Sequence, residues 1–135
     1  MVRIDAIYQG KKHCLATHQP SNSMIETDAP KDNQGLGEKF SPTDLVATAL
    51  GTCILTTIAM VVERDNVDIK GATISVEKVM GDKPRRIASL KTTIHMPKNI
   101  PEDYRRKITQ TAEVCPVKKS LSSEIETPVE IVYDL

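Results

Sequence analysis

Two of the three cysteines, Cys53 and Cys115, stand in surroundings that suit a pair of redox-active thiols. Cys53 lies within an uncharged run, where the residues three, four and seven positions away are mostly apolar. A cysteine in such a place is commonly a small buried hydrophobe, and an apolar site raises the pKa of a thiol. Reactivity at Cys53 therefore requires a cation or a hydrogen-bond donor from elsewhere in the fold.

Cys115 stands directly before Pro116, where a short helix is expected to begin. The N–H groups at a helix N-terminus favour a thiolate, and Lys118 and Lys119 add positive charge within the next turn. The other interpretation is a cysteine that only terminates a helix. Of the two residues, Cys115 is the easier thiolate on this local reasoning.

One buried cysteine and one cysteine at a helix start suit the reduction of peroxides. One thiolate attacks the O–O bond and becomes a sulfenic acid, and the other thiol condenses with it to a disulfide. An apolar pocket around the attacking thiol favours organic hydroperoxides, and an external dithiol must restore both thiols. The two cysteines are 62 residues apart, and such a separation does not decide whether they meet in the fold.

The third cysteine, Cys14, lies between His13 and His18. A cysteine with two histidines suggests a metal, but no second cluster has ligand spacing, so we expect no metal. The sequence also lacks C-x-x-C, H-E-x-x-H, G-x-S-x-G and a phosphate-binding glycine loop. We therefore expect no bound cofactor, and hydrolase and nucleotide-binding functions have no support.

Composition predicts one domain over residues 1–135, with a core built from aliphatic side chains. The chain has one Phe, three Tyr and no Trp, which makes a second subunit a reasonable source of buried area. Its net charge is zero, so no global field attracts nucleic acid or an anionic membrane. The N-terminus has no signal-peptide pattern and the cysteine count is odd, so we expect a cytoplasmic protein.

Hydrophobic patterns predict separate groups of strands and helices, which is an α+β order. The longest helix begins after Ser41, with Pro42 at its first position and Asp44 able to complete a capping box. Its uncharged run is 18 residues long, the lower limit for a membrane span. Four threonines and a glycine dilute that run, so we expect a helix buried in protein and no membrane. Strands are expected at residues 2–8, 11–18, 23–27, 69–80, 85–96 and 128–133, and further helices from 101 and at 117–123. The first two strands should form a hairpin and residues 28–39 a loop, and Tyr104, Ile108 and Ala112 should form the buried stripe of the helix from 101.

Two segments resemble motifs of the OsmC/Ohr family, which comprises osmotically inducible proteins and organic hydroperoxide resistance proteins. The first is FSPTDLVATALGTC, a helix opened by Pro42 with Cys53 eleven residues later. The second is AEVCPVKKSL, around Cys115. The order of strands and helices also agrees over essentially the whole chain.

The resemblance implies the OsmC-like fold, in which antiparallel sheets wrap a long central helix in an intertwined homodimer. It implies a cysteine-based peroxidase with Cys53 as the attacking thiol and Cys115 as the resolving thiol. Its substrate would be a small hydroperoxide, and the family suggests a lipoyl dithiol as the reductant. Assigning the attack to Cys53 runs against the local reasoning above.

The chain departs from the peroxidase members at the groups that activate the attacking thiol. Those members carry a glutamate after the helix-opening proline, where this chain has Thr43 followed by Asp44. They also carry an N-terminal arginine, for which Arg85 or Arg86 is a candidate substitute. Two rival functions therefore remain: a non-enzymatic dimeric stress protein that binds an apolar ligand between its subunits, and a thiol redox sensor.

Overall fold

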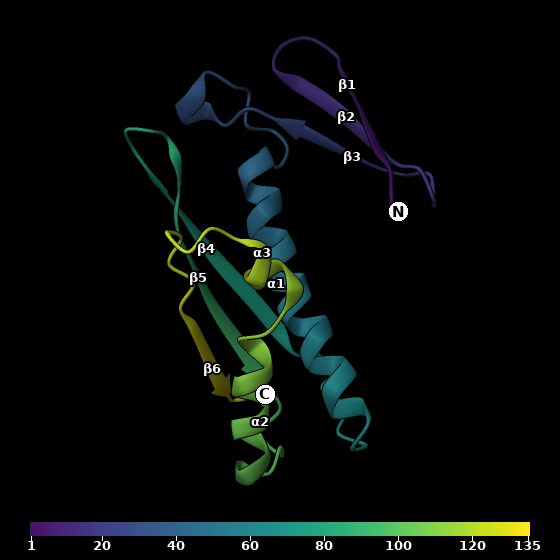
Figure 1. Ribbon diagram of the computed structural model, residues 1–135, viewed down its shortest axis with the longest axis vertical. Helices are drawn as coiled ribbons and strands as arrows, with labels where there is room; N and C mark the ends of the chain where they lie inside the picture. The colour runs from purple at the N-terminus through teal and green to yellow at the C-terminus, as the bar shows by residue number, and fades with distance from the viewer. The chain divides into compact units, whose positions relative to one another are not determined.

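The computed structural model describes residues 1–135, which fall into two compact units, Met1–Val46 and Ala47–Leu135. Each unit contains a three-stranded sheet, and helix α1 (Pro42–Glu63) begins in the first unit and continues through the second (Figure 1). Separate groups of strands and helices confirm the α+β class. The expectation of one domain over the whole chain stays a prediction.

The first unit is an antiparallel meander of β1 (Ile4–Tyr8), β2 (His13–His18) and β3 (Ser23–Asp28), in that order in the sheet. The predicted hairpin is present, and its turn has Gly10 at φ +86°, a left-handed conformation that favours glycine. The segment expected as a loop contains one 3-10 turn, η1 (Lys31–Asn33).

Helix α1 starts as the sequence predicts. The Ser41 N–H donates to Asp44 Oδ2 at 2.9 Å, and the Asp44 N–H donates to Ser41 Oγ at 3.0 Å. This reciprocal pair is a capping box, which satisfies two N–H groups that the helix itself leaves unpaired.

Within one subunit the long helix is buried on one side only, so the expectation that it is buried in protein stays a prediction for its other side. One stripe with a spacing of four is fully buried and the stripe on the opposite side of the helix is exposed, as expected for a helix packed on one side. By length and composition α1 could also cross a membrane, a property that core helices share. The buried stripe is Leu50, Ile54, Ile58 and Val62, and the exposed stripe is Thr48, Thr52, Thr56 and Met60.

The sheet of the second unit has the order β4 (Thr73–Gly81), β5 (Arg86–Met96), β6 (Val129–Tyr133). The β4–β5 pair is antiparallel, but β6 lies parallel to β5 at the edge of the sheet. The expectation of antiparallel sheets is therefore wrong for β6. The reason is that helices separate β5 from β6 in the chain, and such a crossover returns the chain to the end of the sheet where β5 began.

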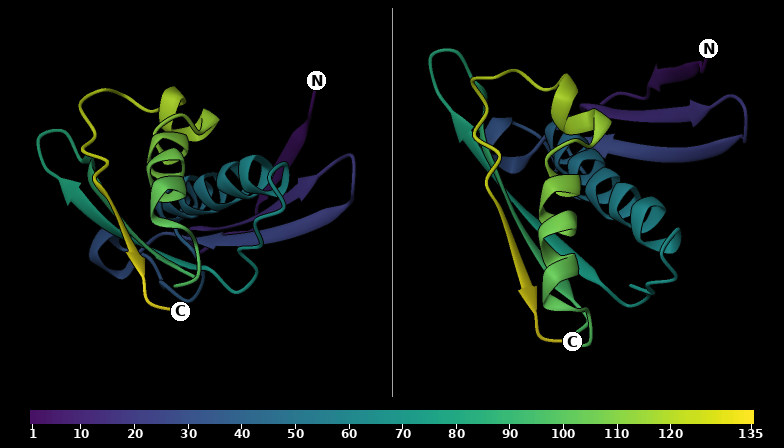
Figure 2. Two further views of the ribbon diagram at one scale, coloured as in Figure 1. Left: turned by 90° about the horizontal axis from the view of Figure 1, so that it is seen from below. Right: turned by 60° about the horizontal axis from the view of Figure 1, so that its bottom comes forward.

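Helices α2 (Glu102–Ala112) and α3 (Pro116–Ser120) form this crossover. Within the second unit, α1 and α2 lie on the same face of the sheet, as the views in Figures 1 and 2 show. The predicted stripe on α2 is present, with Ile108 and Ala112 buried and Tyr104 half-buried. The core of the unit consists of this stripe, the buried stripe of α1, and Leu90, Ile94 and Met96 of β5.

Candidate active site

The structure brings Cys53 and Cys115 together. Cys53 lies half-buried on α1, and Cys115 lies between α2 and α3 with no exposed surface. A hydrogen-bonding interaction between the two thiols is one of the influences on the pKa of Cys115. Both residues are free thiols in this structure, so the arrangement is that of a reduced pair.

Close packing of α1 on the sheet fixes the position of Cys53. A Cβ atom added to Gly51 would lie 3.0 Å from Val76 Cγ2 and 3.6 Å from Ile74 Cγ2, both on β4. The absent side chain therefore lets the helix backbone approach the sheet two residues before Cys53. On the next turn, Thr57 Oγ1 lies 4.0 Å from Cys53 Sγ and is a polar neighbour of that thiol.

Lys118 contacts Cys115 through its main chain and anchors the surrounding segment through its side chain. The Lys118 N–H donates to Cys115 Sγ at 3.3 Å, which makes Cys115 the N-cap of α3, as predicted. The Lys118 ammonium donates to Glu113 Oε2 at 2.6 Å and to the Thr127 carbonyl at 3.1 Å. The Cys115 segment is thus tied to the end of α2 and to the chain just before β6.

Burial raises the pKa of the Cys115 thiol, and the neighbouring Cys53 raises it further. The Lys118 N–H and ammonium act in the opposite direction but do not reverse the shift. The helix start therefore does not make Cys115 a ready thiolate, because desolvation disfavours the charged form more than the helix start favours it. Cys53 is the more accessible of the two thiols.

Thr43 and Asp44, at and beside the position of the usual glutamate, and Arg86, a candidate for the missing arginine, have contacts of their own. Asp44 completes the capping box, and Thr43 Oγ1 lies 3.2 Å from Ser41 Oγ in the same helix start. Arg86 donates through one guanidinium nitrogen to the carbonyls of Asp82 and Pro84, at 2.9 and 3.0 Å, within the β4–β5 turn. Within the second unit, Arg86 therefore stabilises a turn.

Sequence reasoning noticed Lys118 as a nearby charge but missed its two anchors, Glu113 and Thr127. Neither residue belongs to a motif, and their proximity to the ammonium depends on how the chain folds after α3. The contact of Thr57 with Cys53 could have been found, since residues four apart on a helix are neighbours.

Cys14 lies in the first unit, on β2, opposite Tyr8 on β1 and Thr27 on β3. It is a free thiol, and no group of three or more His, Cys, Asp or Glu side chains is placed to hold a metal ion. No role for Cys14 follows from the sequence beyond the rejected metal site, and the structure adds none.

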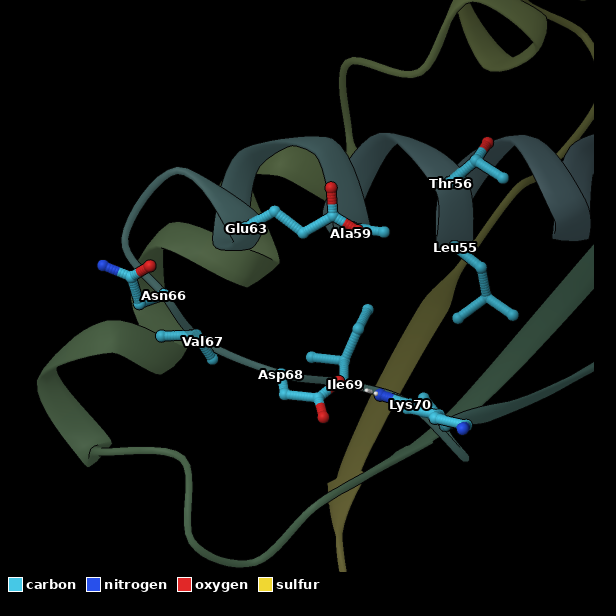
Figure 3. Close-up of a pocket in the computed structure, with 10 residues that line it drawn as sticks. Leu55, Thr56, Ala59, Glu63, Asn66, Val67, Asp68, Ile69 and Lys70 are labelled. Atoms are coloured by element: carbon cyan, nitrogen blue, oxygen red, sulfur yellow. Dashed lines mark hydrogen bonds between the residues drawn. The ribbon is translucent and has the colours of Figure 1, made fainter.

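The second unit also has an open pocket of about 540 Å³ beside the C-terminal half of α1 (Figure 3). Its apolar lining includes Leu55, Ala59 and Ile69, while Glu63 and Lys70 supply charge. The size is in the range of small-molecule pockets. Neither Cys53 nor Cys115 lines it, so the pocket and the thiol pair are separate features.

Comparisons with known proteins agree with this fold. Residues 35–130 match the family described as OsmC-like protein, and the chain belongs to that family. It is 41% identical to a proposed osmotic stress induced and detoxification response protein from Psychrobacter arcticus 273-4. The two structures superpose with a TM-score of 0.93, covering 98% of this chain and 96% of the other.

More distant relatives share the fold. An organic hydroperoxide resistance protein from Elizabethkingia anophelis is 15% identical, with a TM-score of 0.78 over 99% of this chain and 98% of the other. An uncharacterized protein of Bacillus subtilis (strain 168), YmaD, is 21% identical and matches 94% of this chain and 90% of its own length. At these identities the likeness concerns the architecture alone.

Proposed function

We propose that the protein is a thiol-dependent peroxidase that reduces organic hydroperoxides through Cys53 and Cys115. The observation that carries the proposal is the meeting of the two thiols, one accessible and one buried, in a chain of the OsmC-like family. The name organic hydroperoxide resistance protein, which several relatives of the same fold bear, supports the choice of substrate class.

The cycle balances with these two residues and an external dithiol. The Cys53 thiolate attacks one oxygen of the hydroperoxide, the O–O bond breaks, and an alcohol leaves after taking a proton. Cys53 is then a sulfenic acid, and the Cys115 sulfur attacks it to form the Cys53–Cys115 disulfide and release water. A dithiol, with a lipoyl group as the proposed carrier, reduces this disulfide and is itself oxidised.

The accessible position of Cys53 supports its role as the attacking thiol, and the burial of Cys115 supports its role as the resolving thiol. A thiol with a raised pKa is a poor first nucleophile at neutral pH. It needs only to reach the adjacent sulfenic acid, where proximity compensates for a low thiolate fraction. This assignment agrees with the resemblance and not with the local reasoning from sequence.

We also propose a homodimer working in the cytoplasm. The sheet of the first unit leaves large apolar side chains exposed, and a second subunit is the simplest cover for them. These side chains are Ile4, Ile7, Tyr8, Met24 and Ile25. Sedimentation of the purified protein tests the dimer, and a monomer at micromolar concentration would contradict it.

Peroxide consumption by the wild type, Cys53→Ser and Cys115→Ser tests the cycle, with cumene hydroperoxide as substrate and dihydrolipoamide as reductant. We expect the wild type to turn over and Cys53→Ser to be inactive. Cys115→Ser should react once and stop as an oxidised Cys53, visible as added oxygen in the intact mass. Cys14→Ser is the matched control and should retain wild-type turnover.

A wild type that consumes no hydroperoxide with any dithiol would contradict the proposal. The rival functions would then apply, a dimeric protein that binds an apolar ligand or a sensor that signals by its disulfide. The observation that favours a rival is the absence of the usual glutamate after Pro42, where this chain has Thr43.

A further inference from the structure

Lys118 has contacts that distinguish it from its neighbour Lys119. The Lys118 side chain is 13% exposed and ends in two short contacts, to Glu113 Oε2 at 2.6 Å and to the Thr127 carbonyl at 3.1 Å. Lys119, the next residue, is exposed and its ammonium has no such anchor. The two lysines therefore carry the same charge in different structural settings.

Glu113 and Lys118, which form an ion pair, lie on either side of Cys115 in the sequence. Glu113 precedes Cys115 by two residues at the end of α2, and Lys118 follows it by three in α3. The ion pair between them closes a short loop with Cys115 inside it. The contact with Thr127 fastens that loop to the chain leading into β6, which is itself paired with β5. The Cys115 sulfur is thus fixed relative to the sheet on which α1 and Cys53 rest.

We propose that Lys118 is a positioning residue for the resolving thiol, which it holds within reach of Cys53 through its contacts with Glu113 and Thr127. The proposal rests on the Cys53–Cys115 disulfide proposed above and adds the group that makes Cys115 competent. It also explains how a cysteine without exposed surface can react, since the charge that it needs comes from a cation already held in place by the protein.

Two titratable groups, Cys53 and Lys118, act on the Cys115 thiol, and a third, Glu113, is paired with the Lys118 ammonium. Cys53 faces it from α1, Glu113 lies at the end of α2, and Lys118 extends from α3. Lys118 is the cation among them. Its N–H and its ammonium both lower the pKa of the thiol, against burial and Cys53, which raise it. Removing the ammonium leaves only the backbone N–H to oppose the desolvation of the thiolate.

The first test measures the titration of Cys115 alone, in a protein that carries Cys14→Ser and Cys53→Ser. The Cβ chemical shift of isotopically labelled cysteine reports the protonation state without requiring a reagent to enter the site. Lys118→Met should raise the pKa of Cys115 by about half a unit to one unit, the effect of one nearby charge at high effective dielectric. Lys119→Met removes the same charge and should shift it by less than half as much. Lys118→Arg should restore most of the wild-type value.

The second test measures positioning by the rate of disulfide formation in the Cys14→Ser protein, with diamide accepting the two electrons and two protons. Glu113→Gln weakens the anchor but keeps the Lys118 charge, and it should slow formation of the Cys53–Cys115 disulfide about threefold, as for loss of a partly exposed ion pair. Glu124→Gln, at an exposed glutamate in the turn after α3, is the matched control and should form the disulfide at the rate of the Cys14→Ser protein.

The outcomes separate this proposal from the peroxidase cycle. If the parent protein forms no Cys53–Cys115 disulfide with diamide, the cycle fails. If it does, but Lys118→Met and Lys119→Met shift the titration equally, Lys118 has no special role. If Lys118→Met shifts the pKa of Cys115 but Glu113→Gln leaves the rate of disulfide formation unchanged, Lys118 acts only as a nearby charge. That result would overturn the positioning role.

Discussion

The first unit of the molecule is stabilised internally by other interactions than the second unit. In the first unit the buried side chains, Asp28 and Ser41, are polar. Every buried apolar side chain of the protein lies in the second unit, from Ala47 onward. The first unit therefore relies on hydrogen bonds and the second on removal of apolar surface from water.

The buried polar groups of the two units also differ in how well they are satisfied. Asp28 accepts a hydrogen bond from the His13 ring at 2.6 Å and from the N–H groups of Glu38 and Lys39 at 3.1 and 3.0 Å. Thr92, fully buried on β5, has a hydroxyl with no partner. Asp28 is thus integral to the first unit, whereas the Thr92 hydroxyl is a defect in the second, because an unpaired buried hydroxyl costs free energy.

The largest effect is expected from the apolar core of the second unit. Ile94 on β5 has no exposed surface, and Ile94→Ala should lower the free energy of unfolding by about 2–5 kcal/mol through lost burial and a cavity. Urea denaturation followed by circular dichroism measures the loss. The loss in the free energy of unfolding should be the same at every protein concentration.

The matched change in the first unit is Ile7→Ala on β1. Ile7 is 61% exposed, so its truncation should leave the stability of one subunit nearly unchanged. If a second subunit covers it, the variant should instead shift the monomer–dimer equilibrium toward monomer, which sedimentation detects. A loss as large as that of Ile94→Ala at all concentrations would show that the first unit has an apolar core after all.

Removing the defect at Thr92 should stabilise the protein. Valine has nearly the same shape as threonine without the hydroxyl, so Thr92→Val should raise the free energy of unfolding by about 1 kcal/mol. The control is Thr111→Val, because the Thr111 hydroxyl donates to the Lys107 carbonyl at 2.8 Å and its loss should not stabilise. Destabilisation by Thr92→Val would mean that the hydroxyl has a partner in solution.

The cluster of His13 and Asp28 in the first unit should protect nearby backbone amides from hydrogen exchange most strongly in mildly acidic solution. Asp28 raises the pKa of His13 above its usual 6.5, and His13 lowers the pKa of Asp28 below its usual 3.8. The His13 contribution is complete below pH 6.5 and is lost as the pH rises through its folded pKa, whereas that of Asp28 is complete above pH 3.8 and is lost as the pH falls.

Hydrogen exchange at the Glu38 and Lys39 amides measures this prediction, because both donate to Asp28. Protection factors, corrected for intrinsic exchange, should be constant between those two values and should decrease above neutral pH. Asp28→Asn should reduce protection and remove most of its pH dependence. Protection that continues to increase above neutral pH would exclude the pair as its source.

The smallest effect is expected at the exposed cluster of Asp65, Tyr104 and Lys107 in the second unit. The Lys107 ammonium at 2.7 Å and the Tyr104 hydroxyl at 2.6 Å lower the pKa of Asp65. Its contribution is complete above pH 3.8 and is lost as the pH falls through the folded pKa. Asp65→Asn should therefore lower the melting temperature slightly at pH 7 and by less at pH 3.

A double-mutant cycle with Tyr104→Phe separates this cluster from general charge effects. The two single changes should be less than additive, because they break the same hydrogen bond. Strict additivity at pH 7 would mean that the contact contributes nothing in solution, as is common for exposed pairs.

Local patterns in the sequence predicted those parts of the fold that depend on neighbouring residues. The capping box of Ser41 and Asp44 and the α2 stripe at Ile108 and Ala112 follow from spacings of three and four, and both are present. The parallel pairing of β6 was missed, because a short strand carries no local sign of its direction. The OsmC-like motifs supplied the family that the comparisons then confirmed.

The candidate site was predictable in its residues but not in its electrostatics. The sequence named Cys53 and Cys115, and it identified Cys115 as a helix cap. It could not show that Cys115 is fully buried, because that burial is produced by residues distant in the chain. For the same reason Glu113 and Thr127 could not be named as the anchors of Lys118.

The proximity of Cys53 and Cys115 has a consequence for the unfolded chain. A bond between residues 62 positions apart would close a long loop, and the lost freedom of the unfolded chain corresponds to about 4 kcal/mol in the chain-entropy description. The oxidised protein should then melt at a higher temperature than the reduced protein. Oxidation would make the protein harder to unfold until a dithiol reduces the bond. The melting temperature would then report whether the two thiols are oxidised or reduced.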